Sequence, residues 1–199
     1  VSATNVALNA NGEMGALAFD ATFAYLTGEA GEIDIAAYGI DGQVTFKAAE
    51  GVTLGVFGTY TTGQDFTEDD LMTYNAIMDA IVGAPDGRLF LVEANGVAAN
   101  GGHTKYDYTD SIFGQMNFGL MVEAVMGKAT ILAQYGYCSF AEDNAADEAF
   151  IGHEVDLKGS YEVAPATTFF VEFGYLTAGD DSINEEAAYE AAFGLTTNI

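Results

Sequence analysis

Apolar and polar residues alternate along most of the chain, in many separate runs. Between Leu17 and Tyr25, for example, Phe19 and Phe23 share one side with both ends, and Asp20 lies on the other. The alternation recurs over 36–46, 52–61, 115–126, 130–137, 154–163, 169–175 and 187–199, with a weaker opening run around Val6 and Leu8. Because successive side chains of a strand point to opposite faces, each run predicts an amphipathic β-strand. The chain is therefore predicted to be all-β with about nine strands.

The connections between these runs are short and long in turn. Tight turns are predicted at 14–15, 48–51, 127–128 and 164–166, and longer connections at 28–32, 63–111, 141–149 and 179–186. Short turns at one end of the strands and long loops at the other predict an antiparallel up-and-down meander. No linker divides the chain, so we expect a single domain over 1–199 with a long loop insertion at 63–111.

The longest connection contains the one segment with a helical pattern. Thr67 is a suitable N-cap and Asp70 supplies the acid of a capping box, so a helix is predicted over 68–82. Two placements of this loop stay open: it folds inward as a constriction, or it forms an external cap or a contact with another chain. The stretch RLFLVEANGV at 88–97 is an alternative strand, although its apolar residues run together.

The charge balance restricts the classes of partner. The chain carries 30 acidic residues against 5 Lys plus Arg, a net charge of −25. This imbalance repels nucleic acid and anionic headgroups and favours cations. The 14 Phe and 11 Tyr argue against disorder, and the single Cys138 excludes an internal disulfide and a Cys-based zinc site. His103 and His153 are isolated in the sequence, no catalytic spacing emerges, and we expect no enzyme.

Two packings suit a meander of amphipathic strands. In a soluble barrel the apolar face points inward, whereas in an outer-membrane barrel it faces lipid and the lumen is polar. The polar face here is rich in Gly, Ala, Ser and Thr, which suits a lumen better than a charged soluble exterior. Aromatic residues recur near both strand ends, as expected at two membrane interfaces: Tyr25, Tyr60, Tyr137 and Tyr175 near the long loops, and Phe46, Tyr161 and Phe169 near the tight turns. These features favour the transmembrane barrel.

Two stretches resemble a known family. The segment HEVDLKGSYEVAPATTFFVEFGYLTAGDD, 153–181, is similar to the penultimate hairpin of bacterial porins of the alginate-export-like type, and VTLGVFGTYTTGQD, 52–65, resembles an earlier strand of the same group. The resemblance covers roughly the last fifty residues and is vague before them. It implies a diffusion channel in the bacterial outer membrane and brings no catalytic motif with it.

The strand count predicts that the barrel extends beyond this chain. The last run, AAYEAAFGLTTNI at 187–199, has the amphipathic pattern of a closing strand, although Ile199 stands where Phe is usual. If this end is periplasmic, nine strands place Val1 on the opposite side, whereas complete single-chain barrels have even strand numbers. We therefore expect strands before Val1, with this chain as the C-terminal part of a larger barrel. A miscounted strand is the rival explanation.

Charged residues on the polar face are the candidate site. The residues expected to line the pore are Asp20, Asp41, Glu123, Glu154, Asp156, Glu162, Glu172, Glu190, Lys47 and Lys158. Fixed carboxylates along a water-filled path lower the energy of cations and raise that of anions. The alternative is that these acids only keep the face hydrated, or pair with Lys47 and Lys158.

The acidic loops supply weaker candidates for calcium. Oxygen ligands occur at Glu142, Asp143, Asp147, Asp180 and Asp181, but their spacing matches no dedicated calcium loop, so solvated surface is the simpler interpretation. No cofactor is otherwise expected. The expected partners are the outer-membrane lipid bilayer, small solutes or cations, and further copies of the chain in a homo-oligomer such as a trimer. The rival interpretation is a secreted or cell-surface structural β-protein that assembles through its strand edges.

Overall fold

The computed structural model describes residues 2–64, 72, 89, 112–143, 148–177 and 186–197. Within these ranges the chain forms nine strands: β1 (Ser2–Met14), β2 (Leu17–Ala30), β3 (Ile33–Ala49), β4 (Val52–Thr61), β5 (Gln115–Met126), β6 (Ala129–Ser139), β7 (Phe150–Ala164), β8 (Thr167–Leu176) and β9 (Ala188–Thr197). The described part of the chain contains no helix, and hence none long and apolar enough to cross a membrane. The helix predicted over 68–82 and the alternative strand at 88–97 lie outside the described residues except for Met72 and Leu89.

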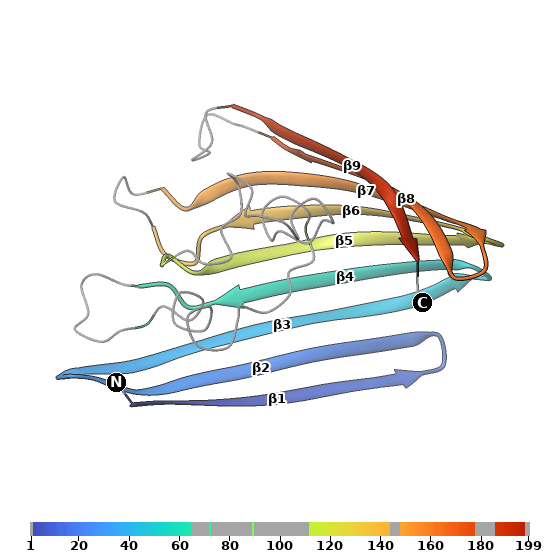
Figure 1. Ribbon diagram of the computed structural model, residues 1–199. Helices are drawn as coiled ribbons and strands as arrows, with labels where there is room; N and C mark the ends of the chain where they lie inside the picture. The colour runs from blue at the N-terminus through green and yellow to red at the C-terminus, as the bar shows by residue number, and fades with distance from the viewer. Residues whose placement is uncertain are drawn as a thin grey trace.

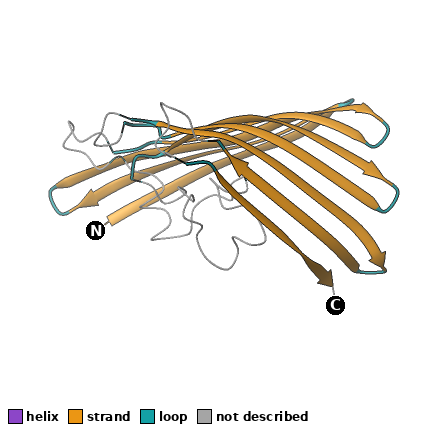
Figure 2. Ribbon diagram, turned by 90° about the horizontal axis from the view of Figure 1, so that it is seen from above, coloured by secondary structure: helices purple, strands orange, loops and turns teal. Residues whose placement is uncertain are grey.

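The nine strands form one antiparallel sheet in which each strand pairs with its neighbour in the sequence (Figures 1 and 2). The predicted all-β up-and-down meander is therefore confirmed. The sheet is open: β1 and β9 form its two edges and do not pair with each other. Because consecutive strands alternate in direction, β1 and β9 run the same way, as Figure 1 shows.

Several strands extend beyond the alternating runs that predicted them. β2 continues through Gly28 to Ala30 and β3 begins at Ile33, so the longer connection predicted at 28–32 is wrong: the two strands are joined by Gly31 and Glu32. Gly31 has φ +74°, which is the conformation that a tight turn of this kind requires and that glycine adopts without strain. The ladder between the two strands pairs all fourteen residues of β2, from Leu17 with Phe46 to Ala30 with Ile33.

Three irregularities interrupt the otherwise continuous register. They fall between Lys47 and Ala49, between Cys138 and Ser139, and between Glu162 and Ala164. At the second, Cys138 pairs with Gly152 and Ser139 with Phe150, so β7 contributes an extra residue. A bulge of this kind re-aims side chains, and Ile151 is fully buried there.

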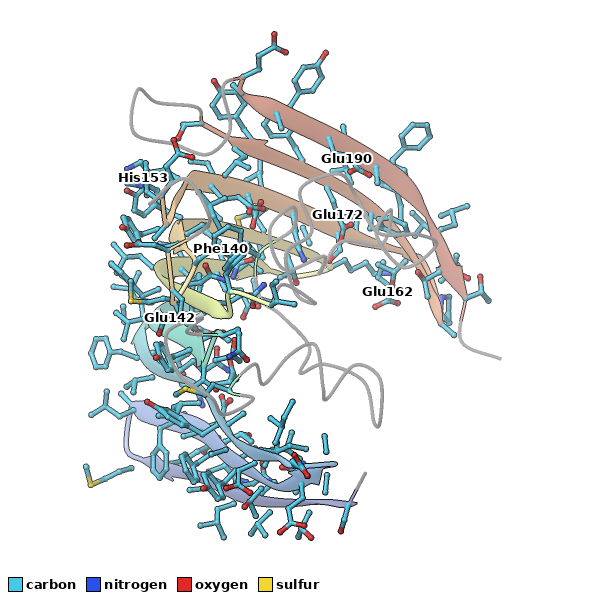
Figure 3. All side chains as sticks on the ribbon, turned by 90° about the vertical axis from the view of Figure 1, so that its left-hand side faces the viewer. Phe140, Glu142, His153, Glu162, Glu172 and Glu190 are labelled. Atoms are coloured by element: carbon cyan, nitrogen blue, oxygen red, sulfur yellow. The ribbon has the colours of Figure 1, made fainter. Side chains whose placement is uncertain are left out.

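The two faces of the sheet differ in chemistry. One face carries large apolar side chains that stay exposed, with Phe19 at 47%, Phe118 at 54% and Leu157 at 50% of their full accessible surface. The other face carries the acids and most of the buried groups. The sheet curves so that Glu162, Glu172 and Glu190 lie on its concave side and His153 on its convex side (Figure 3). Below, the "convex face" is the apolar one and the "concave face" the acidic one.

Candidate functional site

The strand register places all ten predicted pore-lining residues on the concave face. On the side of β2 and β3, Asp20 pairs with Gln43 and Thr22 with Asp41. Lys47 and Glu123 both pair with Thr53, which lies between them on β4. β7 contributes Glu154, Asp156, Lys158 and Glu162, β8 contributes Glu172 and β9 contributes Glu190. Alternation of side chains therefore collects carboxylates from six strands on one surface.

Near the β1 edge, Asp20 and Asp41 accept hydrogen bonds from uncharged side chains. The side-chain amide of Gln43 donates to Asp20 Oδ2 at 2.5 Å, and the hydroxyl of Thr59 donates to Asp41 Oδ2 at 2.9 Å. Because the donors are neutral, these contacts orient the carboxylates without cancelling their charge. Lys47 and Lys158, which the sequence offered as partners, are not the donors in either contact.

The acids on β7 and β8 are the most enclosed charged groups of this face. Glu154 and Asp156 are 0% and 1% exposed, and Glu172 is 8% exposed. Lys158 lies directly opposite Glu172 across the β7–β8 ladder and two residues from Asp156 along β7. One cation thus stands among several buried carboxylates, which leaves the surface negative overall. At the turn end, by contrast, Glu162 is exposed and forms an ion pair with Lys128, whose Nζ lies 3.6 Å from Glu162 Oε1.

Buried amide groups add polar surface to the concave face. Gln134, which pairs with Asp156 in the register, is 7% exposed, and its Oε1 meets no hydrogen-bond donor within the described part of the chain. Gln115 is 3% exposed; its backbone N–H donates to Thr61 Oγ1, while its Nε2 meets no acceptor there. Buried polar atoms cost free energy unless they are hydrogen-bonded, and water commonly satisfies them. These amides therefore add uncharged polar groups to the concave face.

An apolar cluster on the same face was not predicted from the sequence. It consists of Phe57, Leu89, Cys138, Phe140, Ile151, Leu176 and Ala188. The signal for Phe57 was available, because it breaks the run of small and hydroxyl residues on its side of β4. Leu89 and Phe140 lie outside the strands, so no alternation marks them. A second, smaller cluster of Ala24, Leu26, Ile35 and Ala37 occupies the concave side of β2 and β3.

Aromatic rings gather on the convex face near the ends of the strands that adjoin the longer connections. Tyr38 lies 6.3 Å from Phe23 and 5.7 Å from Tyr60, measured between ring centroids. Phe118 stacks on Tyr137 at 4.9 Å. At the tight-turn end, Tyr161 pairs directly with Phe169 across the β7–β8 ladder. The predicted positions of aromatic residues at both strand ends therefore correspond to two bands on this face.

His153 contacts aromatic residues of the neighbouring strand β6. Its Nδ1 forms a hydrogen bond of 2.8 Å with the hydroxyl of Tyr135, and the two rings stack at 5.6 Å. Tyr137 and Phe150 contact the imidazole edge-on, at 5.8 and 5.3 Å. The histidine thus belongs to the aromatic band of the convex face, whereas His103 lies outside the described residues.

Two of the five calcium candidates lie among the described residues. Glu142 and Asp143 lie after β6, and Asp147, Asp180 and Asp181 fall outside the described residues. Within the residues that the structure describes, no group of three or more His, Cys, Asp or Glu side chains has an arrangement that would hold a metal ion. Searches against protein-family models and against curated proteins find no match for the chain.

Proposed function

We propose that this chain forms part of the wall of a porin in a bacterial outer membrane, through which small hydrophilic solutes diffuse passively, cations preferentially. The observation that carries the proposal is the division of the sheet into an exposed apolar convex face and an acidic, amide-rich concave face. In a transmembrane β-barrel the apolar face contacts lipid and the polar face lines the channel.

The extent of the exposed apolar surface supports contact with lipid. Large apolar side chains remain exposed on all nine strands, from Val6 on β1 to Leu195 on β9. Soluble monomers rarely expose contiguous apolar patches above a few hundred Å². The aromatic bands at the two strand ends suit the two membrane interfaces, where amphipathic rings are favoured.

The two edge strands of the sheet need further strand partners if the sheet is part of a closed barrel. Unpaired backbone N–H and C=O groups within hydrocarbon cost several kcal/mol each, so β1 and β9 need strand partners if the sheet spans a membrane. Since β1 and β9 run in the same direction, closing the barrel through antiparallel pairs needs an odd number of further strands between them. An odd number of further strands gives an even total, as in single-chain outer-membrane barrels such as the porins that the sequence resembles. A homo-oligomer such as a trimer would then bury further convex surface.

The charge of the concave face supports a preference for cations. Eight carboxylates face two lysines there, and three of those carboxylates are at least nine-tenths buried. Charges held in a confined path act on permeant ions through less screening than exposed ones. At ~10 Å separation physiological salt already weakens the attraction of a carboxylate for a cation, so the channel favours cations without excluding anions.

Planar-bilayer recordings test this function. The purified full-length protein should insert and produce stepwise conductance, and under a salt gradient the reversal potential should have the sign of cation preference. Protein that folds in detergent and gives no conductance would refute the channel. Conductance with an anion-preferring reversal potential would refute the role of the acids while leaving the channel in place.

The open edges also favour a second candidate, a secreted or cell-surface structural β-protein that assembles edge to edge. In the described sheet β1 and β9 each pair with a single neighbouring strand, and unpaired edges are templates for pairing with another chain. Its convex face would then be a subunit interface. Solubility decides between the two: a porin requires detergent and migrates differently on gels before and after heating, whereas the assembly would be soluble without detergent.

A further inference from the structure

Lys47 differs from the other lysines among the described residues in the charge of its neighbours. Lys128 forms an ion pair with Glu162, with 3.6 Å between the charged atoms. Lys158 lies directly opposite Glu172 across the β7–β8 ladder. Lys47 has no acid directly opposite it on either side, although it lies on the face where the acids gather.

Glu123 also faces uncharged residues on both neighbouring strands. It pairs with Thr53 on β4 and with Leu132 on β6. Lys47 lies between Thr53 and Ala16, whose carbonyl oxygen accepts the backbone N–H of Lys47 at 2.8 Å. Thr53 therefore stands between a cation and an anion, each one strand away. Within the described part of the chain, no ion pair or hydrogen bond engages either charged side chain.

The spacing of these two charges suits a solute that carries both signs. Neighbouring strands lie about 4.8 Å apart, so the backbones at Lys47 and Glu123 are about 10 Å apart across β4. Side chains stand roughly perpendicular to a sheet, and on the concave side their ends converge (Figure 3). Two charge-assisted hydrogen bonds span about 6 Å, which leaves about 4 Å or less for the charges of the solute. An α-amino acid carries its carboxylate and its ammonium group on one carbon, so its charges are this close together.

The surface beside these groups is apolar and accessible. Gly55 is the next residue of β4 on the same face as Thr53, and a Cβ there would lie 2.7 Å from Met121 Cγ, so Met121 covers bare backbone at this point. Lys47 is exposed, and Thr53 and Glu123 are half-buried, so none of the three is enclosed. A methionine side chain is flexible and adapts to apolar groups of different shapes. The side chain of a bound amino acid can therefore vary while its two charged groups are held.

We propose that Lys47, Thr53 and Glu123 form a subsite on the concave face for zwitterionic solutes of the α-amino acid class. The Lys47 ammonium group donates to the carboxylate of the solute, the Glu123 carboxylate accepts from its ammonium group, and the Thr53 hydroxyl forms a hydrogen bond between them. Binding follows from this arrangement alone, whereas the passage of such solutes rests on the proposed channel function. Because the two protein charges compensate each other, the subsite favours a solute of no net charge, unlike the excess of acids elsewhere on this face.

Binding of two related probes to the full-length protein in detergent tests the subsite without reference to conduction. L-Leucine carries both charges, whereas leucinamide carries only the ammonium group. Ligand-detected nuclear magnetic resonance measures such weak affinities. Lys47→Gln and Glu123→Gln should each weaken leucine binding about three- to fivefold, as expected for the loss of one exposed charge pair. Leucinamide should lose affinity in Glu123→Gln and not in Lys47→Gln, because it has no carboxylate for the lysine to bind.

Two control variants make the same changes of net charge elsewhere. Lys128→Gln lies in the turn between β5 and β6 and Glu29→Gln near the far end of β2, and both should leave leucine binding unchanged. The charge swap of Lys47→Glu with Glu123→Lys should restore leucine binding, because a zwitterion can bind in the reverse orientation.

The possible outcomes separate the subsite from the channel. Protein that is folded by gel mobility, and whose leucine binding is indifferent to both single substitutions, would overturn the subsite. A charge swap that binds leucine no better than the single variants would overturn it as well. Leucine binding as expected, in a protein that never conducts in planar bilayers, would overturn the channel function and leave the subsite standing. Conductance without leucine binding would overturn the subsite alone.

Discussion

The sharpest consequence of the proposal concerns a single charge on the convex face. Leu120 lies at the middle of β5, between Val56 on β4 and Tyr135 on β6, and 58% of its surface is exposed. If this face contacts hydrocarbon, Leu120→Arg places a guanidinium near the centre of the bilayer. If this face contacts water, the same substitution is one of the mildest available.

The expected cost has two parts. Removing a fully lipid-buried leucine side chain forfeits about 1.5–3 kcal/mol, so the exposed 58% of Leu120 accounts for about 1–2 kcal/mol. An arginine at the midplane of a membrane barrel adds about 2–4 kcal/mol. The sum is about 3–6 kcal/mol, which lowers the folding equilibrium constant in bilayers at least about 100-fold, since ~1.4 kcal/mol is tenfold.

Two control variants separate lipid contact from general damage. Gln43→Arg introduces the same side chain on the concave face, where Asp20 now accepts a hydrogen bond from Gln43, and should change stability by about 1 kcal/mol or less. Val163→Arg lies near the tight-turn end of β7 and is 51% exposed at present. It should cost about 1–2 kcal/mol, because the penalty for arginine falls to about 0–1 kcal/mol near the interface.

Guanidinium titrations of protein refolded into lipid vesicles measure the three costs. The chain has no Trp, so circular dichroism and gel mobility are the suitable readouts. The proposal predicts that Leu120→Arg costs clearly more than either control. Equal costs for Leu120→Arg and Gln43→Arg would refute lipid contact, and equal costs for Leu120→Arg and Val163→Arg would indicate a dry protein interface without the depth dependence of a bilayer.

Three further variants test the acidic face and the turns. Glu172→Gln should lower the cation-to-anion permeability ratio measured by reversal potential, more strongly at 0.1 M salt than at 1 M, where the screening length falls from ~10 to ~3 Å; an unchanged ratio at low salt would argue against its role. Gly51 has φ +72° and a Cβ there would lie 2.4 Å from the Val125 carbonyl oxygen, whereas Gly127 has φ +62° with nothing within 4 Å. Denaturant titration should therefore find a cost of about 1–2 kcal/mol for Gly127→Ala, from backbone strain alone, and a larger one for Gly51→Ala; a reversed order would contradict the turn geometry. Ala166 has φ +60°, so Ala166→Gly should stabilise the fold by up to about 1 kcal/mol in the same titration, and a loss of stability would contradict the strain assigned to that turn.

Alternation along the sequence predicted the sheet well because successive side chains of every strand point to opposite faces of the sheet. A period of two identifies strands wherever the two faces differ, so the runs at 52–61 and 115–126 agree with β4 and β5 to the residue. The rule fails where the two faces are alike. At the far end of β2, Leu26 is buried on the side opposite Tyr25, and the alternation fades although the strand continues to Ala30.

The candidate site was predictable only in part. The acids of the concave face follow from strand parity, which the register reproduces for Asp20 on β2 and Glu190 on β9 alike. The burial of Glu154 and the packing of Leu89 against Gly136 depend on which segments far apart in the sequence meet in space. No local sequence pattern encodes those contacts. The bond between His153 and Tyr135 likewise arises from pairing across β6 and β7.

The most direct test of which face contacts lipid compares two adjacent residues of β7. Spin labels are attached to Leu157→Cys and to Lys158→Cys, each in a Cys138→Ala background, in protein reconstituted into vesicles. Power saturation then measures collisions with lipid-soluble oxygen and with a water-soluble nickel complex. If the convex face contacts lipid, the label at residue 157 collides mainly with oxygen and the label at residue 158 mainly with nickel. Equal accessibility at both positions, or the reverse order, would contradict it.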